Sequence, residues 1–197
     1  MKLLLSITVT VLIMFNLNGQ APVGTWTDHL SYNTSAGIAG NSQITYASTG
    51  ASVLVHESGM NEIRKLSPVS GLSETGIAAI GWSEEARSLV IAYNSLNLDL
   101  INGSKIENIP DIRNRFPGSK KKINRIRTRG EFAYLASGYG IIIADIARKE
   151  IRDTWKPGQY EEDNEVFDIT FGNGTVYAAT SNGLWQADIQ NQALAYP

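Results

Sequence analysis

A short motif occurs four times in this sequence: an alternating strand-like run, a small polar turn and a second apolar run. The copies occupy residues 43–55, 89–101, 132–145 and 176–188. Each copy has an alanine before its turn, and the steps between these alanines are 45, 44 and 43 residues: Ala47, Ala92, Ala136 and Ala179. A period in the forties with about four short strands per repeat is typical of a β-propeller blade.

Each repeat is predicted to form one antiparallel sheet. In the second repeat the expected strands are residues 77–82, 88–93, 97–101 and 105–109, separated by turn-forming residues. The alternation has period two, and no segment longer than a few turns has helical periodicity. The predicted fold class is therefore all-β, a β-propeller of about four four-stranded blades. For the outer strand of the fourth blade the candidate is residues 193–196.

The N-terminus resembles a secretory signal peptide, because Met1 and Lys2 precede an apolar run at residues 3–15 and a polar stretch follows. That run is short for a membrane span, although an uncleaved anchor is the alternative. We expect a signal peptide at residues 1–20 and a propeller domain at residues 21–197. The chain has no cysteine, which excludes disulfides and cysteine lipidation. Export places the protein in the periplasm or at the outer-membrane cell surface.

Charge is unevenly distributed in the mature chain, which has 16 basic and 19 acidic residues and a net charge of −3. That balance excludes a general nucleic-acid binder. Eight of the 17 basic residues of the full chain lie close together: Arg113, Arg115, Lys120, Lys121, Lys122, Arg125, Arg127 and Arg129. An acidic cluster follows: Glu161, Glu162, Asp163 and Glu165.

These clusters have two interpretations. In the first interpretation, both clusters are solvated segments between blades, and Arg125, Arg127 and Arg129 lie on one face of a strand. Alternatively, the eight basic residues contact an anionic glycan or the acidic surface of a protein partner, where exposed charge steers association.

The sequence offers few groups for catalysis. Its histidines are His29 and His56, and cysteine is absent. Asp28 and His29 are neighbours on a predicted strand, so their side chains point to opposite faces and cannot form the hydrogen bond of a catalytic dyad. The spacing of potential ligands matches no metal site. We therefore expect a protein without catalytic residues, cofactor or metal.

Several motifs, in order along the chain, resemble one known family. They are TWTDHLSYN at residues 25–33, LSPVSGLSETGI at 66–77, LVIAYNSLNLDLI at 89–101 and AYLASGYGIIIADIARKEIRDTW at 133–155. Together they are similar to the N-terminal β-propeller of the PorZ family, a component of the type IX secretion system of Bacteroidota, over residues 22–189. The fourth repeat, ITFGNGTVYAATSNGLWQADI, also resembles sensor-type regulator propellers of hybrid two-component systems.

The PorZ resemblance implies a non-catalytic scaffold of the cell envelope. Such a protein works with the sortase-like machinery of the cell surface and helps to attach cargo to anionic lipopolysaccharide. The resemblance also implies two seven-bladed propellers followed by a small β-sandwich, so this chain corresponds to an open part of the first propeller. The alternatives are a ligand-sensing regulator-type ectodomain, or a hydrolase or lyase built on a propeller.

Closure of the propeller depends on residues 25–30 (TWTDHL), which are predicted to form an outer strand without inner strands before it. In closed propellers such a strand commonly completes the last blade. Either it pairs with the fourth repeat in a four-bladed ring, or its partner lies beyond Pro197. We expect the second arrangement, and hence an open arc.

The expected signal peptide gives the first testable prediction. We expect cleavage near Gln20, because a short apolar run after Lys2 suits a signal peptidase better than a membrane anchor. Intact-mass measurement of the envelope protein checks this, with a Lys2→Glu variant that should delay export as the comparison. An envelope protein that retains residues 1–20 would contradict the prediction.

Overall fold

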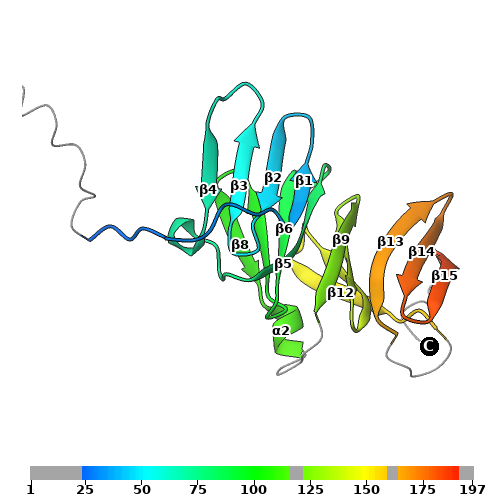
Figure 1. Ribbon diagram of the computed structural model, residues 1–197. Coiled ribbons are helices and arrows are strands. Elements are labelled where there is room, and N and C mark those ends of the chain that lie inside the picture. The colour runs from blue at the N-terminus through cyan, green and yellow to red at the C-terminus, as the bar shows by residue number, and fades with distance from the viewer. Residues whose placement is uncertain (1–23, 116–121, 159–163, 191–197) are drawn as a thin grey trace, which may run out of the picture.

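The computed structural model describes residues 24–115, 122–158 and 164–190. In these ranges the chain forms four antiparallel β-sheets that follow one another along an arc, with the first sheet at the left of Figure 1 and the fourth at the right. Every sheet is a meander, in which each strand pairs with the next one in sequence. The predicted all-β class and the open part of a propeller are thus confirmed.

The strands fall where the alternating pattern places them. The first sheet contains β1 (Gly37–Gly40), β2 (Ile44–Ser48), β3 (Val53–Glu57) and β4 (Ile63–Leu66). The second contains β5 (Ile77–Ser83), β6 (Ser88–Tyr93), β7 (Leu98–Asn102) and β8 (Lys105–Ile109). The third contains β9 (Ile123–Arg129), β10 (Phe132–Ser137), β11 (Gly140–Asp145) and β12 (Glu150–Trp155). In the fourth, the described strands are β13 (Val166–Gly172), β14 (Thr175–Thr180) and β15 (Gly183–Asp188).

Two single turns of helix lie in the links between sheets: η1 (Pro68–Ser70) and α2 (Asp111–Arg115). The sequence analysis predicted no helix at either place. In η1, Ser67 and Ser70 form a capping box, in which the Ser67 amide donates a hydrogen bond to Ser70 Oγ at 2.7 Å. Such local bonds need no long periodic pattern, which explains why neither helix was predicted.

Apolar cores at the junctions between neighbouring sheets hold the arc together. The junction of the first and second sheets buries Tyr46, Val55, Leu89 and Ile91. The next junction buries Val90, Leu98, Leu135 and Ile142, and the last buries Tyr134, Ile141, Ile169 and Val176. Every residue of β6 and β11 is buried, because alternate side chains of these strands face a different sheet on each side.

Aromatic pairs recur at two of the junctions. Tyr46 on β2 stacks on Trp82 of β5, with ring centroids 5.7 Å apart. Tyr134, at the corresponding place on β10, meets Phe171 of β13 edge-on at 4.8 Å. Both tyrosines therefore reach from the second strand of one sheet to the innermost strand of the next.

The innermost strands approach most closely at β5 and β9. A Cβ atom on Gly81 would lie 2.6 Å from Ile126 Cγ2, so only glycine fits there without a shift. Beside this contact, the Thr128 hydroxyl donates to the Trp82 carbonyl at 2.5 Å, and the Ser83 hydroxyl donates to the Gly130 carbonyl at 2.9 Å. The narrow end of this junction is thus fixed by close approach at Gly81 and by hydroxyl bonds to backbone carbonyls.

The repeat equivalence needs one correction in the first sheet. The last pair before the hairpin turn is Ser48 with Val53, and its counterpart in the third sheet is Ala136 with Ile141. Ser48 is buried on the face of Tyr46, whereas Ala47 points to the opposite face. Choosing Ala47 as the marker was therefore wrong by one residue, and the structural period at this step is 44 residues.

Residues 25–30, predicted to form an outer strand whose partner lies beyond Pro197, pair with no strand among the described residues. The contacts of this segment are made by side chains instead. The Asp28 carboxylate accepts hydrogen bonds from Ser67 Oγ at 2.6 Å and from the Tyr32 hydroxyl at 2.9 Å, and Lys65 Nζ lies 4.4 Å from the Tyr32 ring centroid. The segment thus lies against the first sheet, at the opposite end of the arc from the fourth. Residues 193–196 lie outside the described ranges.

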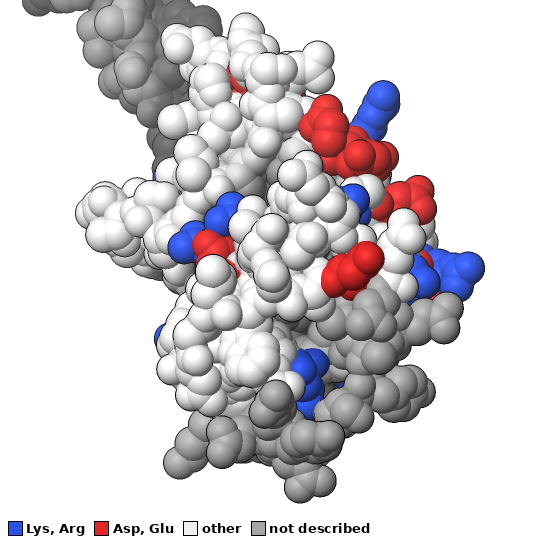
Figure 2. Space-filling model, turned by 90° about the vertical axis from the view of Figure 1, so that its right-hand side faces the viewer, with Lys and Arg blue, Asp and Glu red and all other residues white. Residues whose placement is uncertain are grey.

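The outward face of the fourth sheet, seen in Figure 2, carries few charged side chains. Leu184 on this face is 74% exposed. By strand register, three of its residues correspond to buried junction residues of the third sheet: Tyr177 to Tyr134, Ala179 to Ala136, and Leu184 to Ile141. The repeat therefore gives this face the composition of a junction.

The contact at Gly81 is tested by adding one methyl group. We expect Gly81→Ala to lower the free energy of unfolding by about 1 to 3 kcal/mol, because the β-branched Ile126 has little room to move. Denaturant unfolding measures the change. Gly172→Ala is the matched control, since its added Cβ would meet Tyr177 at an ordinary 3.9 Å. Equal stability of both variants would contradict the close approach.

Candidate binding surfaces

The structure places six of the eight basic residues of the sequence analysis, in two groups of three. Arg113 and Arg115 lie on α2, which appears at the lower end of Figure 1, and Lys122 lies directly before β9. We call the sequence segment 110–122, to which these three residues belong, the α2 link. Arg125, Arg127 and Arg129 lie on β9 itself. Lys120 and Lys121 fall outside the described residues.

The β9 arginines face the fourth sheet. Arg127 binds Asp168 of β13 with two hydrogen bonds, Nε to Oδ1 at 3.0 Å and Nη2 to Oδ2 at 2.8 Å. Arg125 Nε is 3.8 Å from the same carboxylate, and the Arg129 guanidinium lies 5.4 Å from the Phe171 ring centroid. Two guanidinium groups therefore share one carboxylate and the third packs on an aromatic ring, which leaves an excess of positive charge at this junction.

Opposing effects act on the pKa of Asp168. Partial burial raises it, whereas the hydrogen bonds from Arg127 and the Ile169 amide and the charges of both arginines lower it. The charged neighbours prevail, so the pKa lies below its ordinary value of 3.8. Asp168 is consequently ionised at neutral pH, and its ion pair with Arg127 joins the third and fourth sheets. We call this ion pair the Asp168 clip.

On α2, Arg113 forms an ion pair with Glu74, in the link between the first and second sheets. Its Nη1 donates to Glu74 Oε1 at 2.9 Å, and Asn97 Nδ2 donates to the same oxygen at 3.0 Å. Arg115 and Lys122 are exposed, and neither has a carboxylate within ion-pair distance among the described residues. The positive charge of these two side chains is available to a ligand.

A buried carboxylate fixes the link that carries Glu74. Asp99 is fully buried and accepts hydrogen bonds from the Ser73 amide and hydroxyl, the Tyr93 hydroxyl and Asn108 Nδ2, at 2.6 to 2.9 Å. Burial, and then the bond to Asp99, raise the pKa of Tyr93. This network holds Ser73 against the second sheet and so positions Glu74 for Arg113.

The acidic cluster is placed only in part. Glu165 Oε1 accepts a hydrogen bond from Asn124 Nδ2 at 2.9 Å, which links it to β9. Glu161, Glu162 and Asp163 lie outside the described residues.

The histidines do not form a dyad with an acidic residue. His29 and His56 are both exposed, and the Asp28 carboxylate binds the Ser67 and Tyr32 hydroxyls. Within the ranges that the structure describes, no group of three or more acidic, histidine or cysteine residues is arranged to hold a metal ion. In the same ranges, no helix has the length and apolar character needed to cross a membrane.

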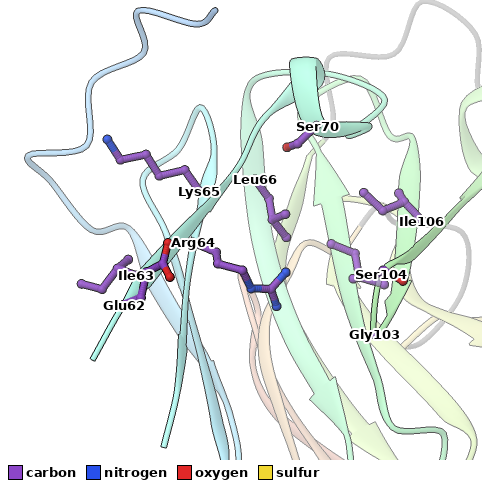
Figure 3. A pocket seen from close by; sticks show the side chains of 10 residues that line it. Glu62, Ile63, Arg64, Lys65, Leu66, Ser70, Gly103, Ser104 and Ile106 are labelled. Carbon is purple, nitrogen blue, oxygen red and sulfur yellow. The ribbon is translucent and has the colours of Figure 1, made fainter. Parts of the chain in front are cut away.

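A groove of about 530 Å³ lies between the outer parts of the first and second sheets, and the sequence analysis did not predict it. Figure 3 shows β4 on one side of it and the β7–β8 hairpin on the other. Residues that line it include Arg64, Leu66, Ser70, Gly103, Ser104 and Ile106. Between the second and third sheets a groove of about 420 Å³ is crossed by an ion pair, Lys149 Nζ to Glu107 Oε1 at 2.7 Å.

Four stacked meanders, with basic side chains at one junction and one link, define a partial β-propeller with binding surfaces. The chain belongs to the family of PorZ N-terminal β-propeller domains of the type IX secretion system, whose family profile matches residues 45–195. The resemblance stated from the sequence is thereby confirmed. Among curated proteins, none matches this sequence.

Solved structures show the same fold. PorZ of Porphyromonas gingivalis, described as an essential bacterial surface component of the type IX secretion system, is 24% identical with a TM-score of 0.70; the match covers 87% of this chain and 23% of that one. The extracellular domain of a putative hybrid two-component system from B. thetaiotaomicron is 16% identical, with a TM-score of 0.61, covering 76% and 20%. The computationally designed Ika4 protein is 11% identical, with a TM-score of 0.60, covering 86% and 98%. The chain thus spans about a quarter of the length of PorZ.

The Asp168 clip predicts a pH-dependent stability. A carboxyl group whose pKa is lowered on folding stabilises the fold above its ordinary pKa, and this contribution is lost as the pH falls through the lowered pKa. We expect Asp168→Asn to lower the free energy of unfolding at pH 7 by about 1 kcal/mol or less, because the pair is partly exposed.

The difference between Asp168→Asn and the wild type should shrink between pH 7 and about pH 2, because the Asp168 carboxylate loses its charge as the pH falls through its lowered pKa. Denaturant unfolding at the two pH values measures it. Asp188→Asn on β15, where no basic side chain among the described residues pairs with Asp188, is the control. A difference that persists unchanged at low pH would show that the clip acts through shape and not charge.

Proposed function

We propose that this chain is a non-catalytic binding module that holds anionic lipopolysaccharide and so supports the attachment of type IX secretion cargo at the cell surface. Its membership of the PorZ N-terminal propeller family makes it a type IX secretion-related module. The protein partners belong to the cell-surface sortase-like complex, and the module acts after export, in the periplasm or at the outer-membrane surface.

One observation carries the choice of an anionic ligand. Arg115 and Lys122 flank the lysine-rich part of the α2 link and have no acidic partner in the described chain, unlike Arg113 and Arg127. Lys120 and Lys121 fall between them in sequence and add two further positive charges. Exposed charge of this kind contributes little to stability, but it attracts anionic groups and orients them.

The β9 arginines extend this basic surface toward the fourth sheet. Asp168 neutralises about one of the three guanidinium charges, so Arg125 and Arg129 remain attractive to an anion. In this surface, Arg127 is held by Asp168 and stabilises the junction. Arg125 and Arg129 are less constrained and can reorient toward phosphate or carboxylate groups.

Two other functions are compatible with the same fold: a ligand-sensing ectodomain, and a hydrolase or lyase. Neither is favoured by a particular contact in the described chain. Propeller architecture hosts all three classes, so the fold does not choose between them.

The proposal is tested by removing the two unpaired charges together. We expect Arg115→Ala/Lys122→Ala in the full chain to weaken binding to lipopolysaccharide of Porphyromonas gingivalis about tenfold at low ionic strength. The loss should shrink at about 1 M salt, where exposed charges are screened. Surface plasmon resonance on captured lipopolysaccharide measures both affinities, and circular dichroism checks folding.

The matched control is Lys105→Ala/Arg148→Ala, which removes two exposed positive charges in the turns at the other ends of the outer strands. Its binding should stay within about twofold of the wild type. If both double variants lose affinity equally, the attraction is a property of total charge, and the α2 link is not a binding site.

A further inference from the structure

The outer edge of the first sheet is the feature that neither the family nor the basic cluster accounts for. Strand β4 is the last strand of its sheet and pairs with β3 alone. Apart from that pairing, its residues 63–66 make no backbone hydrogen bond within the described chain. On β12, by contrast, the Ile151 amide reaches Asp111 of α2 at 3.4 Å. The β4 edge thus presents unpaired donors and acceptors, which is the arrangement that accepts an added strand.

The groove of about 530 Å³ runs alongside this edge (Figure 3). It exists because the β7–β8 turn of the second sheet has only two residues, Gly103 and Ser104. In the third sheet the β11–β12 turn is longer, and its Lys149 reaches across to Glu107. No such side chain crosses from Gly103 to β4. The groove is therefore open to a guest side chain, with Leu66 and Ile106 as apolar walls.

Exposed apolar side chains follow the same edge. Met60 in the preceding turn is 58% exposed, Ile63 on β4 is 57% exposed and Val69 on η1 is 51% exposed. They are three of the seven large apolar residues that are most exposed in the described chain. Apolar side chains grouped along a strand edge are typical of an interaction site.

The charged residues that line the groove are Glu62, Arg64 and Lys65. The Arg64 side chain extends into the groove, whereas Lys65 points to the other side of β4 (Figure 3). Arg64 Nη2 donates to Glu57 at 2.6 Å. Its Nε and Nη1 have no hydrogen-bond partner in the described chain, and its side chain is 47% exposed. A carboxylate that entered the groove could accept hydrogen bonds from these two donors.

We propose that β4 and its groove bind an extended segment of a partner protein by strand addition, with apolar side chains against Ile63 and Leu66 and an acidic side chain at Arg64. Backbone pairing with the edge distinguishes such a polypeptide from a glycan, which has no matching ladder of amide groups. The site lies on the first sheet, away from the α2 link, and it is independent of the proposed lipopolysaccharide binding.

The competing explanation is that Arg64 and Lys65 protect the edge, because charged side chains on edge strands prevent pairing with a second copy of the chain. In that case removal of charge would cause self-association, and no peptide would bind to the wild type. The two explanations therefore predict opposite results in one set of experiments.

The probe is a fluorescent peptide of sequence Thr-Val-Val-Glu-Val-Val with capped ends, which has valines on both faces of the strand beside its glutamate. We expect it to bind the full chain with a Kd below about 1 mM in fluorescence polarisation. Arg64→Glu should weaken binding about tenfold or more, and the same variant should prefer the peptide with lysine in place of glutamate. A peptide N-methylated on alternate amides along its pairing edge should not bind, because it lacks the donors for β4.

Arg152→Glu is the matched control, since Arg152 is an exposed arginine on β12, the outer strand of the third sheet. It should bind the peptide as the wild type does. Arg64→Gln gives a second test if Arg64→Glu does not fold, as judged by circular dichroism.

Failure of the acidic peptide to bind at about 1 mM would overturn the proposal. So would equal binding of the N-methylated peptide, or dimerisation of Arg64→Gln without peptide binding by the wild type. These outcomes leave the lipopolysaccharide test unaffected, because that test changes neither β4 nor the groove.

Discussion

The packing of each sheet on the next is the interaction on which the rest of this structure depends. A four-stranded meander has two faces, and contact with neighbouring sheets keeps side chains such as Val90, Leu135 and Ile142 out of water. Packing is closest at the inner strands, where Gly81 meets Ile126. The outer strands are farther from their neighbours, so grooves and link segments form there. Tight inner contacts and open outer ones together place the β4 groove at the periphery of the arc, whereas the β9 arginines lie on an innermost strand.

Much of the fold was predictable because the signals are local. Period-two alternation and turn residues place every described strand, and the repeat predicts how the sheets follow one another. Residues 25–30 pair with no strand among the described residues, and Asp28 instead bonds hydroxyl groups of Tyr32 and Ser67, which no local pattern indicates. Ala47 failed as a marker because a one-residue change at the hairpin moves a side chain to the other face.

The binding surfaces were less predictable because they depend on distant residues. In the sequence, Arg113 and Arg127 belong to one basic cluster. Their acidic partners, Glu74 and Asp168, are each about forty positions away, so the sequence does not show which basic side chains form ion pairs. The groove beside β4 arises from the short turn at Gly103 and Ser104 in the next sheet. No pattern within β4 itself could have indicated it.

The aromatic pairs have a spectroscopic consequence. Trp82 stacks on Tyr46 between the first two sheets, and Trp155 lies 5.7 Å from Tyr134 near the junction of the last two. The core between the second and third sheets contains no tryptophan in the described chain. The emission of these two indoles therefore reports mainly the separation of a terminal sheet and less the central junction, because neither ring belongs to the central core. A change there is more visible to methods that follow the backbone, such as deuterium uptake by the amides of β6 and β11.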